Sequence, residues 1–112
     1  MASIWVLTQP ADTSKQEAIL ADVITGVRGS KTSVYAIRSD TRDLVPLVEW
    51  STSFDKRDPL PAGFYISFLQ TLDEAQRKNA DLNRLIMAKW VIDQQEWQWL
   101  VQDIEDLAPR EF

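Results

Sequence analysis

The feature that most constrains this chain is the stretch from Asp81 to Leu107, which holds three of its five tryptophans. Apolar residues recur through it at steps of three, four or seven, the spacing of an amphipathic helix. Asp93 followed by Glu96 has the pattern of a helix N-cap with its capping-box partner. We therefore predict two C-terminal helices, Leu82 to Ile92 capped by Asp81, and Gln94 to Leu107 ended by Pro109.

A β-hairpin is the competing interpretation, with Lys89 to Ile92 paired to a strand in which Trp97 and Trp99 alternate. We disfavour it because the connecting residues, Asp93 to Gln95, offer no glycine or asparagine for the positive φ of a tight turn. On a helix, two residues of that spacing are separated by about 200° of rotation, so Trp97 and Trp99 cannot both face the core. The helical interpretation therefore predicts that one of these tryptophans is exposed.

The first part of the chain predicts a strand-helix-strand unit. Ile4 to Leu7 is a continuous apolar run, which fits a central strand buried on both faces. Ser14 and Glu17 repeat the capping-box pattern before an apolar face at helical spacing, so we expect a helix that runs to about Val27. Val34 to Ile37 is the second strand. If the two strands are neighbours, we expect them to be parallel with a right-handed crossover.

Three further segments complete the predicted fold. Leu44 to Trp50 is a third strand, antiparallel to the second and at a sheet edge because Pro46 cannot donate to a ladder. Ser51 to Ala62 has the composition of a loop, and Pro61 to Lys78 has the spacing of a helix started by proline, although Phe64 to Leu69 also fits a strand. The predicted fold class is α/β (α+β): a single globular domain over residues 1–112, with a small mixed sheet of about three strands, a β-α-β start, packed helices and a C-terminal helical pair.

The residue types that most often carry catalysis are missing from the sequence. It has no histidine and no cysteine, and it shows no glycine-rich phosphate loop, nucleophile elbow or calcium loop. We expect no enzyme, no cofactor and no metal site. The N-terminus lacks a signal-peptide pattern, and no apolar run approaches the roughly 20 residues of a membrane span, so we expect a cytoplasmic protein without membrane contact.

The charge is placed unevenly along the chain. The net charge is −5, and residues 1–57 hold seven Lys/Arg against seven Asp/Glu, so the excess lies in residues 58–112, with five against ten. Residues 93–112 alone carry six acids against Arg110. Such an end repels nucleic acid and attracts a basic protein surface. The sparse basic grouping from Arg28 to Arg42 falls short of a nucleic-acid face.

These features predict a small acidic protein-binding domain of the inhibitor, immunity or adaptor kind. Its partner would be another protein with a basic surface, and a homodimer stays open. Tryptophan is enriched among the few residues that dominate binding energy, and carboxylates steer a basic partner. The predicted protein-binding residues are the anchor Trp97 or Trp99 and the acidic surround Asp103, Glu105 and Asp106.

A small-ligand or nucleotide-binding domain is the alternative function, centred on the junction after the first strand. Thr8, Asp12, Thr13 and Ser14 would lie at the carboxyl end of a central strand and at a helix N-terminus, where open α/β sheets often bind ligands. Helix capping alone accounts for Thr13 and Ser14, and Asp12 would oppose an anion. This alternative is therefore the weaker prediction. The other mixed-charge grouping, Arg38 to Asp43, is typical of solvated surface.

Overall fold

The computed structural model describes residues 2–11, 15–51, 56–78 and 81–112. Within these ranges the chain forms two β-sheets and one α-helix. The elements in chain order are β1 Ile4–Leu7, β2 Ala18–Leu20, η2 Ala21–Val23, β3 Ile24–Gly29, β4 Ser33–Arg38, β5 Leu44–Glu49, α1 Phe64–Arg77, β6 Arg84–Val91, β7 Glu96–Asp103, η3 Ile104–Asp106 and η4 Pro109–Glu111.

The two sheets are built from different parts of the chain. The first sheet has the strand order β2-β1-β6-β7, in which β1 is parallel to β6 and the other pairs are antiparallel. The second sheet is the antiparallel meander β3-β4-β5. Because β1 has a neighbour on each side, the prediction of a central first strand is confirmed.

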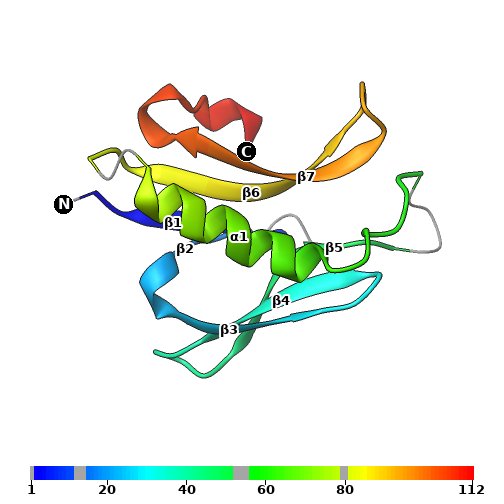
Figure 1. Cartoon of the computed structure of the whole chain (residues 1–112), viewed down its shortest axis with the longest axis horizontal. Coiled ribbons are helices and arrows are strands. Elements are labelled where there is room, and N and C mark those ends of the chain that lie inside the picture. Colours follow the sequence, from blue (N-terminus) through cyan, green and yellow to red (C-terminus); the bar gives the residue numbers. More distant parts are fainter. Residues whose placement is uncertain (1, 12–14, 52–55, 79–80) are drawn as a thin grey trace.

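The helix α1 lies across the two sheets and shares a core with both (Figure 1). Phe68 on α1 is fully buried. It belongs to one apolar cluster with Val6 and Ile86 from the first sheet and Val34 and Leu47 from the second. α1 therefore joins the sheets by burying its apolar stripe against each of them. At 14 residues and with a mixed face, α1 does not meet the length and apolarity of a membrane-spanning helix, and no other described helix does.

The predicted pair of C-terminal helices is wrong, because this stretch forms a β-hairpin. β6 and β7 pair in unbroken register from Arg84 opposite Asp103 to Val91 opposite Glu96. The turn takes its positive φ from Gln95, at 53°, although glutamine rarely adopts that conformation. The side-chain amide of Gln95 supports the turn by donating to the carbonyl of Ile92 at 3.0 Å. Asp93 and Glu96 therefore lie in a turn and a strand, and the capping box does not form.

The predicted β-α-β start is also wrong. The apolar residues assigned to a helix ending at Val27 are divided among β2, η2 and β3. β2 pairs with β1 in antiparallel fashion, and Ile19 packs into the core opposite Val6. β1 and β4 lie in different sheets, so the parallel partner of β1 is β6 instead. A three-strand sheet packed by several helices is thus replaced by two sheets and a single α-helix in the described part of the chain.

Three local predictions are confirmed. β4 and β5 are antiparallel, and Pro46 lies on the edge strand of the second sheet. The segment from Pro61 to Lys78 contains α1, which rules out the strand alternative there. Its start differs, because α1 begins at Phe64 after Gly63, whose φ of 71° is left-handed. Glycine suits this position because it has no Cβ to clash in that conformation.

Candidate functional site

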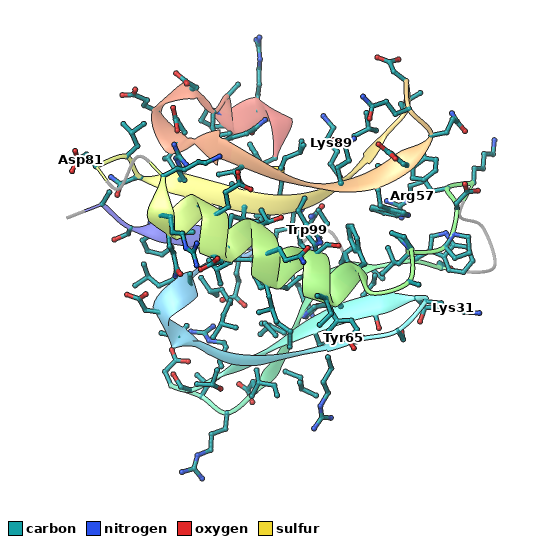
Figure 2. The ribbon with its side chains drawn as sticks, in the orientation of Figure 1. Lys31, Arg57, Tyr65, Asp81, Lys89 and Trp99 are labelled. Carbon is teal, nitrogen blue, oxygen red and sulfur yellow. The ribbon has the colours of Figure 1, made fainter. Side chains whose placement is uncertain are left out.

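Trp97 and Trp99 both point into the molecule, because alternate residues of a strand share one face. Trp97 is only 6% exposed, and its indole Nε1 donates to the carbonyl of Asp58 at 2.8 Å. Trp99 stacks on Phe64 with ring centroids 4.7 Å apart and donates to the Phe64 carbonyl at 2.9 Å. Figure 2 shows Trp99 among the side chains between α1 and the β6–β7 hairpin. The geometry behind the predicted anchor, an exposed tryptophan on a helix, is therefore absent at both positions.

The indoles instead hold the segment that leads into α1. Trp50 Nε1 donates to the carbonyl of Arg57 at 2.8 Å, and the Arg57 guanidinium lies 4.5 Å from the centre of the Trp97 ring. Leu60 is 3% exposed, and its N–H donates to the carbonyl of Lys31 at 2.9 Å. The described part of the loop predicted from Ser51 to Ala62 is therefore fixed to the core, while residues 52–55 lie outside the described ranges.

The three predicted acidic residues stay together at the end of β7. Asp103 is half-buried, with Oδ1 3.4 Å from Nε of Arg84 in the adjacent strand. That contact lacks the geometry of a hydrogen bond, so it is an ion pair held by proximity. Glu105 and Asp106 are exposed on η3, directly after β7. Of the predicted site, the acids remain at the surface and the tryptophans do not.

A groove lies beside these acids, on the face of the first sheet that points away from α1. Leu7, Leu85 and Met87 form a small apolar cluster on this outer face, separate from the main core. Residues 104–112 lie against part of that cluster, with Leu107 packed on it. A groove of about 470 Å³ remains, which we call the acidic groove, lined by Leu7, Gln16, Glu17, Ala18, Leu85, Ile104, Leu107, Pro109 and Phe112.

The acidic groove combines an apolar floor with a charged rim. Phe112 is 48% exposed and Ile104 is 36% exposed, so both present apolar surface to solvent. Glu105 and Asp106 do not line the groove but follow its lining residue Ile104 in the chain, and Asp106 lines an adjoining hollow that shares Leu107. Glu17 lines the other side with its side chain 59% exposed, 3.7 Å from a guanidinium nitrogen of Arg38. An apolar centre within a polar rim is the usual anatomy of a protein interface. Sequence reasoning missed Ile104 and Phe112, because their exposure depends on how residues 104–112 cross the sheet.

The alternative ligand site does not assemble around a helix N-terminus. Thr8 is 3% exposed, and its hydroxyl both accepts from the N–H of Glu17 at 2.8 Å and donates to the Glu17 carbonyl at 3.2 Å. Asp12, Thr13 and Ser14 lie outside the described residues. The chain enters β2 after this junction, where the prediction had a helix. The hydrogen bonds of Thr8 therefore join the end of β1 to Glu17, the residue before β2.

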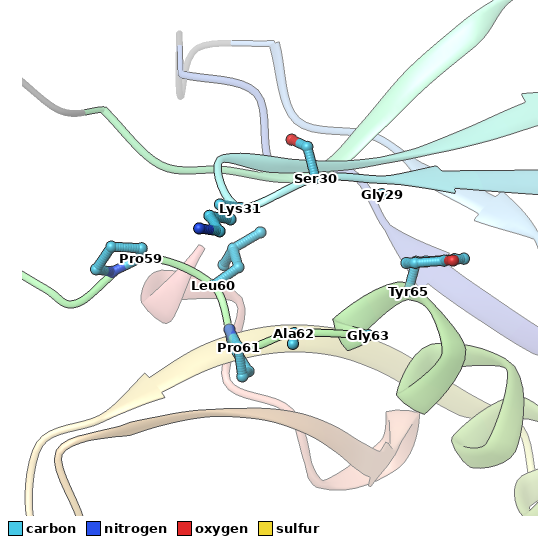
Figure 3. Close-up of a pocket in the computed structure, with 9 residues that line it drawn as sticks. All are labelled: Gly29, Ser30, Lys31, Pro59, Leu60, Pro61, Ala62, Gly63 and Tyr65. Atoms are coloured by element: carbon cyan, nitrogen blue, oxygen red, sulfur yellow. The ribbon is translucent and has the colours of Figure 1, made fainter.

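Two further features have little binding chemistry. A hollow of about 460 Å³ lies between the β3–β4 turn and the start of α1 (Figure 3), lined mostly by proline, glycine and apolar groups with Lys31 as its one charged residue. In the mixed-charge turn, Arg38 pairs with Asp40 at 2.7 Å, and this hydrogen bond lowers the Asp40 pKa. No group of three or more acidic side chains in the described ranges is arranged to hold a metal ion.

Comparison with protein-family profiles, curated proteins and solved structures yields no match to this chain.

Proposed function

We propose that this protein is a small protein-binding domain that docks an apolar, basic segment of a partner protein in the acidic groove. It acts by occupying a partner's surface, as inhibitor, immunity and adaptor proteins do. The observation that carries the proposal is the groove itself: about 470 Å³ of apolar-floored space with Phe112 48% exposed and the carboxylate of Glu17 in its lining.

The apolar floor supplies affinity. Burial of a large apolar side chain is worth about 1.5–3 kcal/mol, so covering the exposed parts of Phe112 and Ile104 gives a substantial share of the free energy of binding. Leu7 and Leu85 beneath them are already buried. They provide a rigid base, which lowers the entropy lost on docking.

The acidic residues orient a basic partner and speed its association. Of the six acids in residues 93–112, Glu105 and Asp106 lie on η3, while Asp93 and Glu96 lie at the distant β6–β7 turn. Glu105 and Asp106 are exposed and follow the groove residue Ile104 in the chain, so a basic partner is attracted from a distance and a like-charged one is repelled. The lack of histidine and cysteine in the sequence also favours binding over catalysis.

The test uses two designed helical peptides, one with leucine on one face and lysine on the other, and one with glutamate in place of lysine. Fluorescence polarisation measures their affinity for the wild-type domain and for Phe112→Ser. We expect the lysine peptide to bind and Phe112→Ser to weaken it at least tenfold, since losing a central aromatic contact costs about 1.4 kcal/mol or more. The matched control is Ile92→Ser, because Ile92 is 73% exposed on the β6–β7 turn, away from the groove. It should change affinity less than twofold.

A second pair of variants separates the rim from the floor. Glu105→Gln combined with Asp106→Asn should slow association and flatten its salt dependence, with little change in dissociation. Asp93→Asn, an acid on the distant turn, is the control. Equal binding of the two peptides, or equal weakening by Phe112→Ser and Ile92→Ser, would show that the groove is not the binding surface.

A further inference from the structure

A second surface is defined by β7, the last strand of the first sheet. β7 pairs with β6 on one side only, over eight residues and without a register shift (Figure 1). Its other long side has no neighbouring strand in the described part of the chain.

The hydrogen bonds between β6 and β7 show which main-chain groups of β7 point to its free edge. The N–H of Ile104 donates to the carbonyl of Asn83 at 3.0 Å, while the N–H of Arg84 donates away from β7, to Ser3, at 3.1 Å. The main-chain N–H and C=O groups of successive strand residues point to opposite sides of the strand. Those of even-numbered β7 residues therefore bond to β6, and those of odd-numbered residues point away from it. The outward N–H and C=O groups of Trp97, Trp99 and Val101 have no hydrogen-bond partner among the described residues.

The other sheet edges are protected and β7 is not. Edge strands usually carry a proline, a lysine, a bulge or very few residues, which prevents pairing with another chain. β5 has Pro46 and a register shift, β3 is irregular between Ile24 and Gly26, and β2 has three residues. β7 has the sequence EWQWLVQD, with none of these devices.

The space between α1 and the end of the hairpin is not completely filled. A hollow of about 260 Å³ lies between α1 and the inner face of β6 and β7, lined by Thr71, Glu74, Ala75, Lys78, Arg84, Trp99 and Val101.

We propose that a second copy of this chain pairs with β7, so that two antiparallel β7 strands join two four-stranded sheets about a two-fold axis. Outward main-chain groups must face each other, so only registers whose paired residue numbers sum to an even value are allowed. The register with Leu100 opposite Leu100 of the second copy fits best. It joins the two outer apolar clusters, to which Leu100 belongs, and it sets Trp99 against Val101. Gln98 then faces Gln102, and no like charges oppose each other.

Charge variants at Gln98 and Gln102 test this register, because both side chains lie on the outer face of β7 and meet only between copies. Two like-charged variants, Gln98→Glu with Gln102→Glu and Gln98→Lys with Gln102→Lys, should weaken dimerisation about tenfold or more. Two mixed variants, Gln98→Glu with Gln102→Lys and the reverse, should dimerise at least as tightly as wild type. Because the like-charged pairs shift the net charge in opposite directions, a general charge effect cannot produce the pattern. Sedimentation equilibrium gives the dissociation constants, and circular dichroism confirms folding.

A cross-link tests the axis directly, since the chain has no cysteine of its own. Leu100→Cys should give a covalent dimer on mild oxidation. Gln102→Cys should not, because its two thiols would lie roughly 13 Å apart in this register. A wild-type chain that stays monomeric at millimolar concentration would overturn the proposal. A dimer that ignores the four charge variants would overturn it too. Neither result depends on the acidic groove, so this inference and the proposed function can fail separately.

Discussion

Gly29 on the second sheet lies directly against Tyr65 of α1, and Gly29→Ala probes this contact. Gly29 is the last residue of β3, and Tyr65 lies in the first turn of α1. A Cβ added at Gly29 would lie 2.3 Å from Cδ1, 2.6 Å from Cγ and 2.7 Å from Cβ of Tyr65. These atoms are at the root of the tyrosine side chain, so a rotamer change alone cannot clear them. The backbone of α1 or of β3 must therefore shift.

The cost follows from two opposing terms. Overpacking of this kind costs about 1–3 kcal/mol, while replacing glycine by alanine within a strand returns about 0.5–1 kcal/mol. We therefore expect Gly29→Ala to lower the free energy of unfolding by about 1–2 kcal/mol. For a domain of this size that corresponds to a fall in Tm of roughly 4–8 °C.

The assay is urea denaturation followed by tryptophan fluorescence, with a double-mutant cycle. In the Tyr65→Ala background the contacts to Cδ1 and Cγ are gone and only the 2.7 Å contact to the Cβ of residue 65 remains, so Gly29→Ala should cost clearly less there than in the wild type. Gly26→Ala is the control in the same strand, because its added Cβ would meet only the end of the flexible Ile37 side chain, at 3.3 Å. It should change stability by less than about 0.5 kcal/mol. If Gly29→Ala costs the same with and without the Tyr65 ring, the steric reasoning is refuted.

Three further predictions concern stability. Trp99→Ala should cost about 3–5 kcal/mol in urea unfolding, because it empties the space against Phe64; an unchanged midpoint would return Trp99 to the list of surface anchors. Gly63→Ala should lower stability by about 1 kcal/mol in thermal denaturation, since its φ of 71° strains any residue with a Cβ although no atom lies within 4 Å of that position. The hydrogen bond from Arg38 lowers the pKa of Asp40, so its contribution is present above the ordinary carboxyl pKa and is lost as the pH falls through the lowered value. Asp40→Asn should thus reduce the urea midpoint near neutral pH and leave it unchanged at about pH 2, and equal effects at both would contradict this assignment.

The sequence alone determined the elements whose signals are local. β4 and β5 follow from two apolar runs separated by a short polar turn, and Pro46 marks the edge because proline has no N–H to donate. The stripe of Phe64 and Phe68 at helical spacing predicts α1. The charge distribution and the lack of histidine and cysteine are also properties of the sequence itself.

Only the tertiary structure decided between helix and strand where the apolar spacing fits both. In β7, Trp97, Trp99 and Val101 match a strand with one buried face, while Trp97, Leu100 and Ile104 match a helix. Strand preference depends mainly on what a side chain packs against, and here α1 supplies Phe64 and Phe68 as the opposing surface. The same contact makes the left-handed Gln95 tolerable, because the packing of the hairpin offsets the strain of its turn.

The residues of the candidate site also fall into two groups, those that the sequence indicates and those that only the tertiary structure shows. Asp103, Glu105 and Asp106 could be found from the sequence, since charged residues near a chain end are solvated in almost any fold. Ile104 and Phe112 could not, because an apolar residue is exposed or buried according to which distant segment covers it. Here the path of residues 104–112 over Leu7 and Leu85, which belong to strands far away in the sequence, leaves both side chains at the rim of a groove.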